Sequence, residues 1–555
     1  MRITIGSFGG IVPRLSRHSL SAMSASIAHD VKLRNGRIEA WKEKCPYADV
    51  LPTSLTFHLH GCCVTAWDTI VESAEVAPDW GRFYITGRTD HPEVVTLDCK
   101  CNPTYTRLGV PAPLDPPYAS GPENCSRASD ARSYVYTYIN KWGEESAPSP
   151  ASNILTVEDG ATVTVSGIAL PPDGYDIVAV NIYRATTGFR EPDVKQQKPL
   201  TDYLYLTTLE LPVTSFVDSV RMAGLGAPLE TMKVRMPPEG LRNIVAMEGV
   251  VRLAGTTKNR VHMTENFQPY NWPVKYDLTL DSSIVHMGAL EQKLFVTTDT
   301  VPYVIDVSSC EDMKCMPVLD AGVAIPDIAC KYPDAAITTQ HGFIYSSPLG
   351  LILLDAQARY HILTKKWFSE DDWAQIKPDT VRLAYWQGFL FCVTDEVSFM
   401  LNIDTDPYGD MRGSELVTIS DKPVDMKVST NGTLFLMQDG VVSVWDKGLE
   451  YRPYTWVSRE LTQGQDSGNG QLPDMTAAFG ALWSPASVKI RCDDVEFTLI
   501  TPVTPEAYKR KVLQHKPFRL PRVGRHLWFK VRLHGIHPVE FLEMGTANFT
   551  VNQGA

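Results

Sequence analysis

The chain has 555 residues and a formal net charge of −12, and 44% of its residues are hydrophobic and 10% aromatic. This apolar content excludes a globally disordered chain. The acidic balance disfavours non-specific binding to DNA, because the phosphates repel a negative surface. A chain of this length is expected to hold about three to four domains, or one large repeat array with insertions.

The sequence predicts a soluble protein made in a cytoplasm. No charged N-terminal segment leads into an apolar run, so we expect no signal peptide. No window approaches the roughly 20 apolar residues that a membrane span needs. The 11 cysteines are an odd number without a framework spacing, and we interpret them as buried thiols.

Residues 1–53 are predicted to form an N-terminal arm. The small and apolar residues of 19–31 favour a short helix with a serine as its N-cap. The Asn35-Gly36 pair lies between two short strand-like runs within residues 32–41. That arrangement predicts a tight hairpin.

A strand–turn–strand pattern recurs along the chain and predicts a β-propeller. Its clearest copy, residues 386–405, contains a glycine turn, an apolar strand, a Thr-Asp-Glu turn and a second apolar strand. Other copies begin at Gly81, Gly249, Gln292, Gly342 and Gly432. From Gly249 onward, successive copies start roughly 42 to 51 residues apart, the period of one four-stranded blade. We therefore expect a first blade at 54–107 and the remaining blades at 236–450.

Residues 108–235 interrupt this repeat. A proline-rich segment at 108–121 has the composition of a linker. Between residues 131 and 218, about five short alternating strands are separated by Gly, Pro and Asp turns. The pattern predicts an immunoglobulin-like or fibronectin-like sandwich inserted after the first blade, since loops between blades accept insertions.

Residues 451–555 are predicted to form a C-terminal β-sandwich or closing strands shared with the propeller. Within them, 509–537 is basic and contains no acidic residue. This run is a candidate interface for an acidic neighbour, the next protein ring rather than DNA. A solvated basic face is the alternative. The candidate residues are Lys509, Arg510, Lys511, Lys516, Arg519, Arg522, Arg525, Lys530 and Arg532.

The sequence predicts neither an enzyme nor a cofactor, and no motif for a nucleophile elbow, a zinc protease, a phosphate loop or a dinucleotide fold occurs. A zinc site requires four converging ligands. Six residues are the candidates for one: His58, His60, Cys62, Cys63, Cys99 and Cys101. We favour polar edge positions and buried thiols over a metal site there. Residues 404–410 have the composition of a calcium loop without its twelfth-position ligand, so an interblade turn is favoured.

The alternative function is a carbohydrate-binding or carbohydrate-cleaving propeller. Four tryptophans are candidates for stacking on sugar rings: Trp367, Trp373, Trp386 and Trp445. A glycosidase needs two carboxylates about 5 to 10 Å apart in a pocket. The sequence offers carboxylates at turns without singling out a pair: Glu370, Asp371, Asp372, Asp395 and Glu396. Tryptophans at blade positions more often pack in a core.

Several motifs, in order along the chain, resemble the tail-nozzle proteins of podophages (tail tubular protein B). The opening segment carries Phe8, Gly9, Pro13, Arg14, Leu33, Gly36 and Trp41. The later motifs are YINKWGEESAPSP (Tyr138–Pro150), ENFQPYNWP (Glu265–Pro273), GLILL (Gly350–Leu354), LTKKWFSEDDW (Leu363–Trp373) and PFRLP (Pro517–Pro521). The sequence departs from the family by lacking a proline near Leu20 and by carrying His29-Asp30 in place of Ala-Asn.

The resemblance implies a structural virion protein, made in the host cytoplasm and placed at the distal end of a short tail. Members of this family form a homo-hexameric tube that docks below an adaptor ring and is surrounded by fibres or spikes. Double-stranded DNA and ejected proteins would pass through the lumen without sequence-specific binding. Because side chains fill the centre of a propeller, the conduit is expected to lie between subunits. The inserted sandwich is then expected to be a docking module.

Overall fold

The structure is a computed structural model that describes residues 2–16, 19–21, 23–34, 36–122, 129–187, 202–247, 249–309, 313–319, 326–330, 332, 335–403, 415–462, 478–484, 489–493, 496–500, 514–519, 528–539 and 542–546. Strands dominate these residues, which confirms the prediction of an all-β chain. The one α-helix among them is α1 (Glu370–Gln375). Short 3-10 turns are η1 (Pro78–Trp80), η2 (Met222–Gly224), η3 (Thr231–Lys233), η4 (Val274–Tyr276), η5 (Pro326–Ile328) and η6 (Pro378–Thr380).

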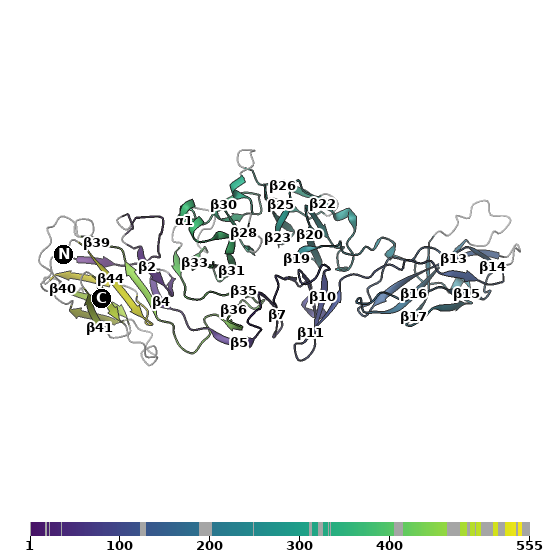
Figure 1. Cartoon of the computed structure of the whole chain (residues 1–555), viewed down its shortest axis with the longest axis horizontal. Helices are drawn as coiled ribbons and strands as arrows, with labels where there is room; N and C mark the ends of the chain where they lie inside the picture. Colours follow the sequence, from purple (N-terminus) through teal and green to yellow (C-terminus); the bar gives the residue numbers. More distant parts are fainter. Residues whose placement is uncertain are drawn as a thin grey trace. The chain divides into compact units, whose positions relative to one another are not determined.

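The chain forms two compact units. The first unit comprises Met1–Thr69, Phe295–Ile305 and Cys315–Ala555, and the second comprises Ile70–Leu294 and Asp306–Lys314. Figure 1 draws both units and labels many of the elements described below. Among the described residues, none of the helices has the length and hydropathy that a membrane crossing needs.

In the second unit, consecutive antiparallel strands form four-stranded sheets with the strand order of a propeller blade. One sheet consists of β8 (Glu72–Ala74), β9 (Arg82–Thr86), β10 (Glu93–Leu97) and β11 (Pro103–Arg107). Another consists of β19 (Arg242–Met247), β20 (Arg252–Thr257), β21 (Arg260–Met263) and β22 (Leu278–Thr279). The first strands of the two sheets, β8 and β19, pack against each other. The first blade predicted at 54–107 therefore contains one such sheet, preceded by a separate hairpin of the first unit.

A further sheet has the same sequential order. It consists of β23 (Ile284–Leu290), β24 (Lys293–Thr298), β25 (Tyr303–Asp306) and β26 (Lys314–Pro317). Its first strand, β23, packs against β19. The strand pair predicted from the copy at Gln292 is thus confirmed.

The first unit contains three more sheets of this kind. The first consists of β27 (Ala336–Thr339), β28 (Gly342–Ser347), β29 (Gly350–Leu354) and β30 (Tyr360–Ile362). The second consists of β31 (Arg382–Trp386), β32 (Phe389–Val393), β33 (Ser398–Asn402) and β34 (Leu416–Thr418). The third begins with β35 (Asp425–Val428), β36 (Leu434–Gln438) and β37 (Val441–Val444). Strand β31 packs between β27 and β35.

The strand pattern predicted for 386–405 is confirmed over the described residues, which extend to Ile403. Trp386 lies opposite Phe389, so two residues make the turn between β31 and β32. Both of them, Gln387 and Gly388, have positive φ values, 48° and 85°. That geometry matches the right-handed twist of the paired strands. All five residues of β32 are buried, as the apolar run predicts.

The fourth strand of the last of these sheets comes from the predicted N-terminal arm. Strand β5 (Cys45–Asp49) pairs antiparallel with β37, with Asp49 opposite Val441 and Cys45 opposite Val444. The hairpin that follows, β6 (Thr56–His60) and β7 (Cys63–Trp67), is a separate two-stranded sheet. Its strand β6 packs against β35. The arm is therefore part of the repeated architecture.

The predicted N-terminal helix is wrong. The chain instead forms β2 (Ala25–His29), which pairs antiparallel with β38 (Tyr454–Ser458) and parallel with β34. Partners more than 380 residues away supply the backbone hydrogen bonds that a helix would have made locally. The adjacent hairpin of β3 (Val31–Arg34) and β4 (Arg37–Ala40) is confirmed, with Arg34 opposite Arg37.

The C-terminal strands share their sheets with strands from the N-terminal part of the chain. The sheet that contains β31–β34 continues through β2 and β38 to β44 (Trp528–Gly535), β42 (Glu496–Ile500) and β41 (Lys489–Asp493), and β39 (Leu461–Thr462) also pairs with β44. A second sheet joins β1 (Arg2–Ile5), β45 (Leu542–Thr546), β40 (Ala478–Ser484) and β43 (Gln514–Arg519).

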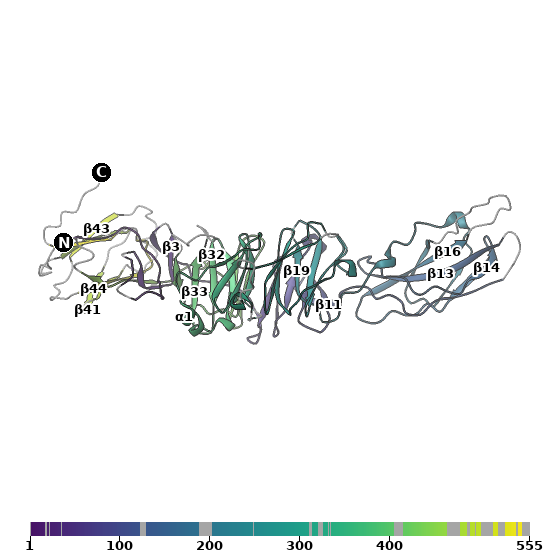
Figure 2. The ribbon, with the colours of Figure 1, turned by 90° about the horizontal axis from the view of Figure 1, so that it is seen from above.

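Two sheets follow β11 in the second unit, where the inserted sandwich is expected. One has the order β12 (Tyr118–Ser120), β15 (Val163–Ser166) and β18 (Ser215–Asp218). The other has the order β14 (Leu155–Glu158), β13 (Ser129–Asn140), β16 (Ile177–Thr187) and β17 (Leu204–Glu210). Figure 2 shows β13, β14 and β16. Both sheets contribute to one core that includes Tyr136, Val165 and Ile182. We call residues 110–218 the two-sheet insertion; its assignment to the immunoglobulin or fibronectin class stays a prediction.

Candidate functional site

The motif Tyr138–Pro150 joins the two-sheet insertion to the blade-like sheet β8–β11. Its turn is closed by Asn140, whose side-chain oxygen accepts from the backbone N–H groups of Trp142 and Glu144, both at 3.0 Å. Gly143 supplies the left-handed φ of 77° that this turn requires. The turn thereby directs the carboxylate of Glu144 toward strand β9.

The carboxylate of Glu144 forms a buried ion pair with Arg82 of β9, with 2.8 Å between Oε1 and Nη2. The guanidinium lies near three aromatic rings, at 4.7 Å from Trp142, 4.9 Å from Trp80 and 5.8 Å from Tyr84. Burial raises the pKa of the Tyr84 phenol, so the ring stays neutral. A paired charge enclosed by aromatic rings holds both partners in one orientation. This cluster fixes the insertion to the sheet β8–β11.

A second set of contacts supports the same junction. The backbone N–H of Arg107 donates to the carbonyl of Gly174 at 2.8 Å. The carboxylate of Asp176 accepts from Thr106 at 2.7 Å and pairs with Lys141 at 2.6 Å. Because these bonds flank the Arg82–Glu144 pair, they restrict rotation of the insertion about it.

The serines that end the motif cover the free edge of strand β13. The Oγ atoms of Ser146, Ser149 and Ser152 accept from the backbone N–H groups of Tyr138, Tyr136 and Tyr134, at 3.0, 3.2 and 2.9 Å. The serine N–H groups donate to the carbonyls of the same tyrosines. A spacing of three residues with intervening prolines is typical of a polyproline II segment, so each turn presents one serine to the strand. Because β14 pairs only with residues Ser129–Arg132 of β13, the serines cover the rest of this edge, and a covered edge cannot pair with another chain.

The serine edge cover gives a direct prediction for the variant Ser149→Ala. The buried N–H of Tyr136 would lose its acceptor, and we expect the insertion to lose about 1–3 kcal/mol of stability. Hydrogen exchange of the β13 amides and thermal unfolding measure this loss. The matched control is Ser120→Ala, because Ser120 is exposed; its effect should stay within about 0.5 kcal/mol. Equal effects of the two substitutions would contradict the assigned role.

The motifs of the first unit also serve packing. Phe8 meets Trp456 edge-on, with 5.0 Å between ring centroids, and the Trp456 Nε1 donates to the carbonyl of Gly9 at 3.0 Å. A side chain at Gly10 would clash with the backbone of Leu416. The segment 8–11 is therefore fitted closely between strands from the far end of the chain.

The four tryptophans considered for sugar stacking are all buried. Trp386 and Trp445 belong to one cluster with Trp41, while Trp367 and Trp373 belong to another. Trp373 Nε1 donates to the carbonyl of Ser347 at 2.8 Å. These rings offer no face to a ligand at the surface.

The carboxylates considered as a glycosidase pair stabilise local structure instead. Asp372 completes the capping box of α1 with Ser369, and hydrogen bonds from Ser369 lower its pKa. Glu396 pairs with Lys377, and Asp395 pairs with Arg382. The acidic run 404–410 lies outside the described residues.

The metal candidates of the first unit lie on one hairpin. His58 and His60 belong to β6, and Cys62 and Cys63 follow at its tip, where Cys63 opposes His60. Burial, and then the charges of Lys427 and His60, lower the pKa of His58 from 6.5 to about 3, so its imidazole is neutral at pH 7. The interpretation of His58 and His60 as polar edge positions stays a prediction.

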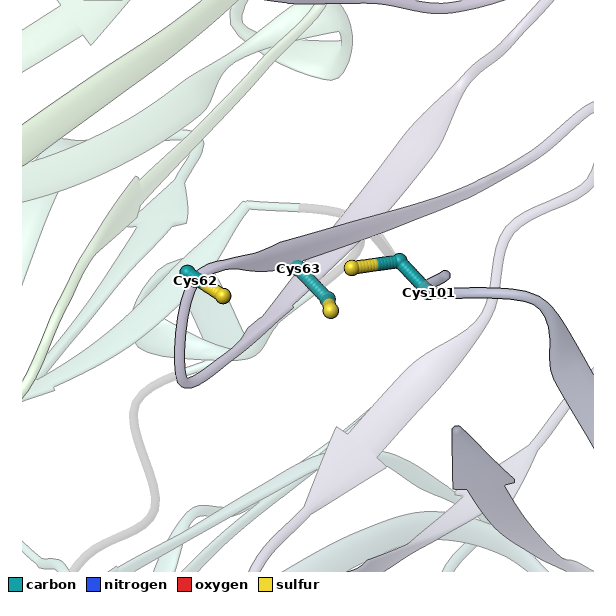
Figure 3. Close-up of side chains that lie close together, drawn as sticks. All are labelled: Cys62, Cys63 and Cys101. Atoms are coloured by element: carbon teal, nitrogen blue, oxygen red, sulfur yellow. The ribbon is translucent and has the colours of Figure 1, made fainter. Parts of the chain in front are cut away.

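The expectation of buried thiols is correct only in part. Cys330 and Cys392 are buried, but Cys45, Cys62 and Cys99 are exposed. Cys63 and Cys101 are not free thiols, because each is part of a disulfide. Figure 3 labels both, and Cys101 belongs to the turn between β10 and β11.

Only part of the basic candidate interface lies in the described residues. Lys530 is largely buried and lies 3.7 Å from the carboxylate of Glu460 in the same chain. Lys516 and Arg519 belong to β43, and Arg532 of β44 lies opposite Val457 of β38. Five candidates lie outside the described residues: Lys509, Arg510, Lys511, Arg522 and Arg525.

Described residues of the second unit line surface depressions. One, of about 450 Å³, is lined by apolar residues such as Val76, Met247 and Phe267, and the carboxylate of Glu75 also lines it. Another, of about 570 Å³, is lined by polar residues that include Glu291, Lys293 and Asp306. Hydrogen bonds from Ser308 lower the pKa of Asp306, which keeps this carboxylate ionised.

Sequence reasoning missed the residues that build the junction and the edge cover. The spacing of Ser146, Ser149 and Ser152 between prolines was a usable signal for an extended segment. Arg82 and Glu144 are 62 residues apart, and neither has a local pattern that indicates the pairing. Only the fold brings them together.

No protein-family model matches the chain, and no curated protein matches it. Among solved structures, the chain is similar to Sqt1 of Saccharomyces cerevisiae, at 10% identity over 73% of this chain and 98% of that one, with a TM-score of 0.27. It is similar to the extracellular domain of the one-component system BT4673 of B. thetaiotaomicron, at 11% identity over 74% and 49%, with a TM-score of 0.26. Likeness at this level supports no conclusion about the chain.

Proposed function

We propose that the chain is a structural virion protein, one subunit of the nozzle at the distal end of a short phage tail. The observation that carries the proposal is the order of the motifs. From Phe8 to Pro521, they follow one another in the same order as in the tail-nozzle proteins that they resemble. The nozzle would dock below an adaptor ring, support fibres or spikes, and conduct the genome and ejection proteins.

The roles of the motif residues support this function. Phe8, Gly9, Trp41, Glu144, Trp367 and Trp373 are buried or tightly packed. They pack strands from distant parts of the chain and fix the two-sheet insertion to its sheet. A conduit must resist deformation while DNA passes, and buried joints of this kind resist it because close-packed interiors are stiff.

We infer that the blade-like sheets close into a β-propeller and that the insertion is a sandwich of the immunoglobulin or fibronectin class. Side chains fill the centre of such a propeller, so DNA would pass through a lumen between subunits around a cyclic axis. The net charge of −12 favours a lumen that repels phosphates, because tight binding of DNA depends on neutralising them.

The mass of the full-length protein, alone and mixed with its tail adaptor, tests the proposal. We expect a ring of six subunits, seen as a six-fold particle with a central hole in negative-stain images. A protein that stays monomeric in both samples and never joins a tail particle would overturn the proposal. Glycan binding by that monomer would identify the carbohydrate-active alternative.

A further inference from the structure

The outer face of the three-stranded sheet β12-β15-β18 carries no charged side chain. Alternation places Ala119, Val165 and Phe216 toward the core. The residues between them form two rows across the sheet. One row is Tyr118, Ser166 and Ser215, and the other is Ser120, Thr164 and Val217.

Two exposed leucines lie beyond the same end of the sheet, Leu114 before β12 and Leu170 after β15. The hydroxyl of Tyr136 donates to the carbonyl of Asp115 at 3.2 Å and accepts from the N–H of Ala169 at 3.1 Å. It therefore holds together the two segments that carry Leu114 and Leu170. These leucines are 87% and 61% exposed. We call the two rows together with Leu114 and Leu170 the neutral face.

The composition of the neutral face is that of a protein contact surface. Tyrosine offers a large area at low entropic cost, and serine and threonine offer adaptable hydrogen bonds. Four of its members are large exposed apolar side chains: Leu114, Tyr118, Leu170 and Val217. Adjacent exposed apolar side chains mark interaction sites in soluble proteins. The segments that form this face contain two carboxylates: Asp115, beside Leu114 in the chain, and Asp218 of β18, which is buried on the opposite side of the strand.

We propose that the neutral face binds a second copy of this chain, and this inference rests on the proposed ring of identical subunits. Two copies that each carry a charge of −12 repel each other, so they approach best where neither presents a charge. A partner of opposite charge would instead be recognised through charged residues, which this face lacks. Eight side chains are fewer than the roughly 20–30 residues per side of a standard interface, so the neutral face forms one part of the contact between subunits.

The variant Val217→Glu tests this assignment. Val217 is 55% exposed, so the substitution adds a carboxylate to the face without removing core packing. The matched control is Val178→Glu, at a valine that is 49% exposed on the other sheet, in β16. Leu114→Glu is a second test variant. Far-ultraviolet circular dichroism establishes folding of each full-length variant before assembly is measured.

Sedimentation velocity over a range of protein concentrations, with and without the adaptor, gives the readout. We expect Val217→Glu and Leu114→Glu to need at least about tenfold more protein for half-assembly, while Val178→Glu assembles like the wild type. If the wild type forms rings and both test variants form them equally well, the inference is overturned and the proposed nozzle function stands. Variants that form rings but lose the adaptor would show the adaptor to be the occupant and would also overturn it. Absence of rings in the wild type, with and without adaptor, would overturn the proposed function.

Discussion

Replacing Asp218 with asparagine is expected to destabilise the two-sheet insertion by about 3–5 kcal/mol, the cost of removing one partner from a buried ion pair. Asp218 is fully buried, and its Oδ2 lies 2.7 Å from Arg184 Nη1 and accepts from the hydroxyl of Tyr134 at 2.7 Å. Arg132 Nη1 lies 3.8 Å away. Both guanidinium groups are fully buried, so the variant leaves positive charge inside the core without its shared carboxylate.

The control for this variant is Asp159→Asn. Asp159 also lies 3.8 Å from Arg132, but its side chain is 45% exposed, so water screens the pair and its loss should cost less than about 1 kcal/mol. Hydrogen exchange of the β13 and β16 amides in the full-length chain measures the local effect, because unfolding of a chain of this size is not a single two-state step. Equal protection in both variants would show that the buried charges do not hold the insertion together.

Replacing Arg452 with methionine is expected to cost about 3–5 kcal/mol in the first unit. Its Nη1 pairs with two buried carboxylates, Asp30 at 3.4 Å and Asp421 in a short contact, and its guanidinium lies 5.1 Å from the Trp445 ring. The control Arg382→Met removes the more exposed pair with Asp395, and it should cost less than about 1 kcal/mol. Denaturant unfolding followed by hydrogen exchange in β2 and β38 compares the two. A smaller loss for Arg452→Met than for its control would refute the cluster's role.

The Arg452 cluster also predicts a pH dependence with a definite sign. Burial raises the pKa of Asp421, but Arg452 and Lys44 outweigh it and hold the pKa below its ordinary value. Asp421 therefore stabilises the wild type above the unfolded pKa of about 3.9, and this stability is lost as the pH falls through the lower folded pKa. Without Arg452, the pKa of Asp421 is lowered less, because Lys44 alone then opposes the effect of burial, so the variant keeps less of this stability. The difference between wild type and variant should thus be larger at pH 7 than at pH 4.

The repeated strand pairs could be predicted because their signals are local. Glycine turns and short apolar runs specify β32 with β33, or β28 with β29, from about twenty consecutive residues. The segment that forms β2 carries no such local signal. Its alanine, serine and isoleucine residues suit either a helix or a strand, and distant partners decided between them. The edge role of β5 and the Arg82–Glu144 joint were unpredictable for the same reason, since each depends on a contact distant in sequence.

The pairing of β5 with β37 constrains the order in which this chain can fold during synthesis. Strand β5 leaves the ribosome early, yet its partner follows about 390 residues later. Likewise, β2 can pair only after β38 has been synthesised, and β1 only after β45. The entropy of closing so long a loop grows only with the logarithm of its length, to about 3 kcal/mol above that of a ten-residue loop. The order of synthesis therefore constrains folding more than the entropy of loop closure does. The middle of the nascent chain can fold first, whereas β1, β2 and β5 pair only after their late partners have been made.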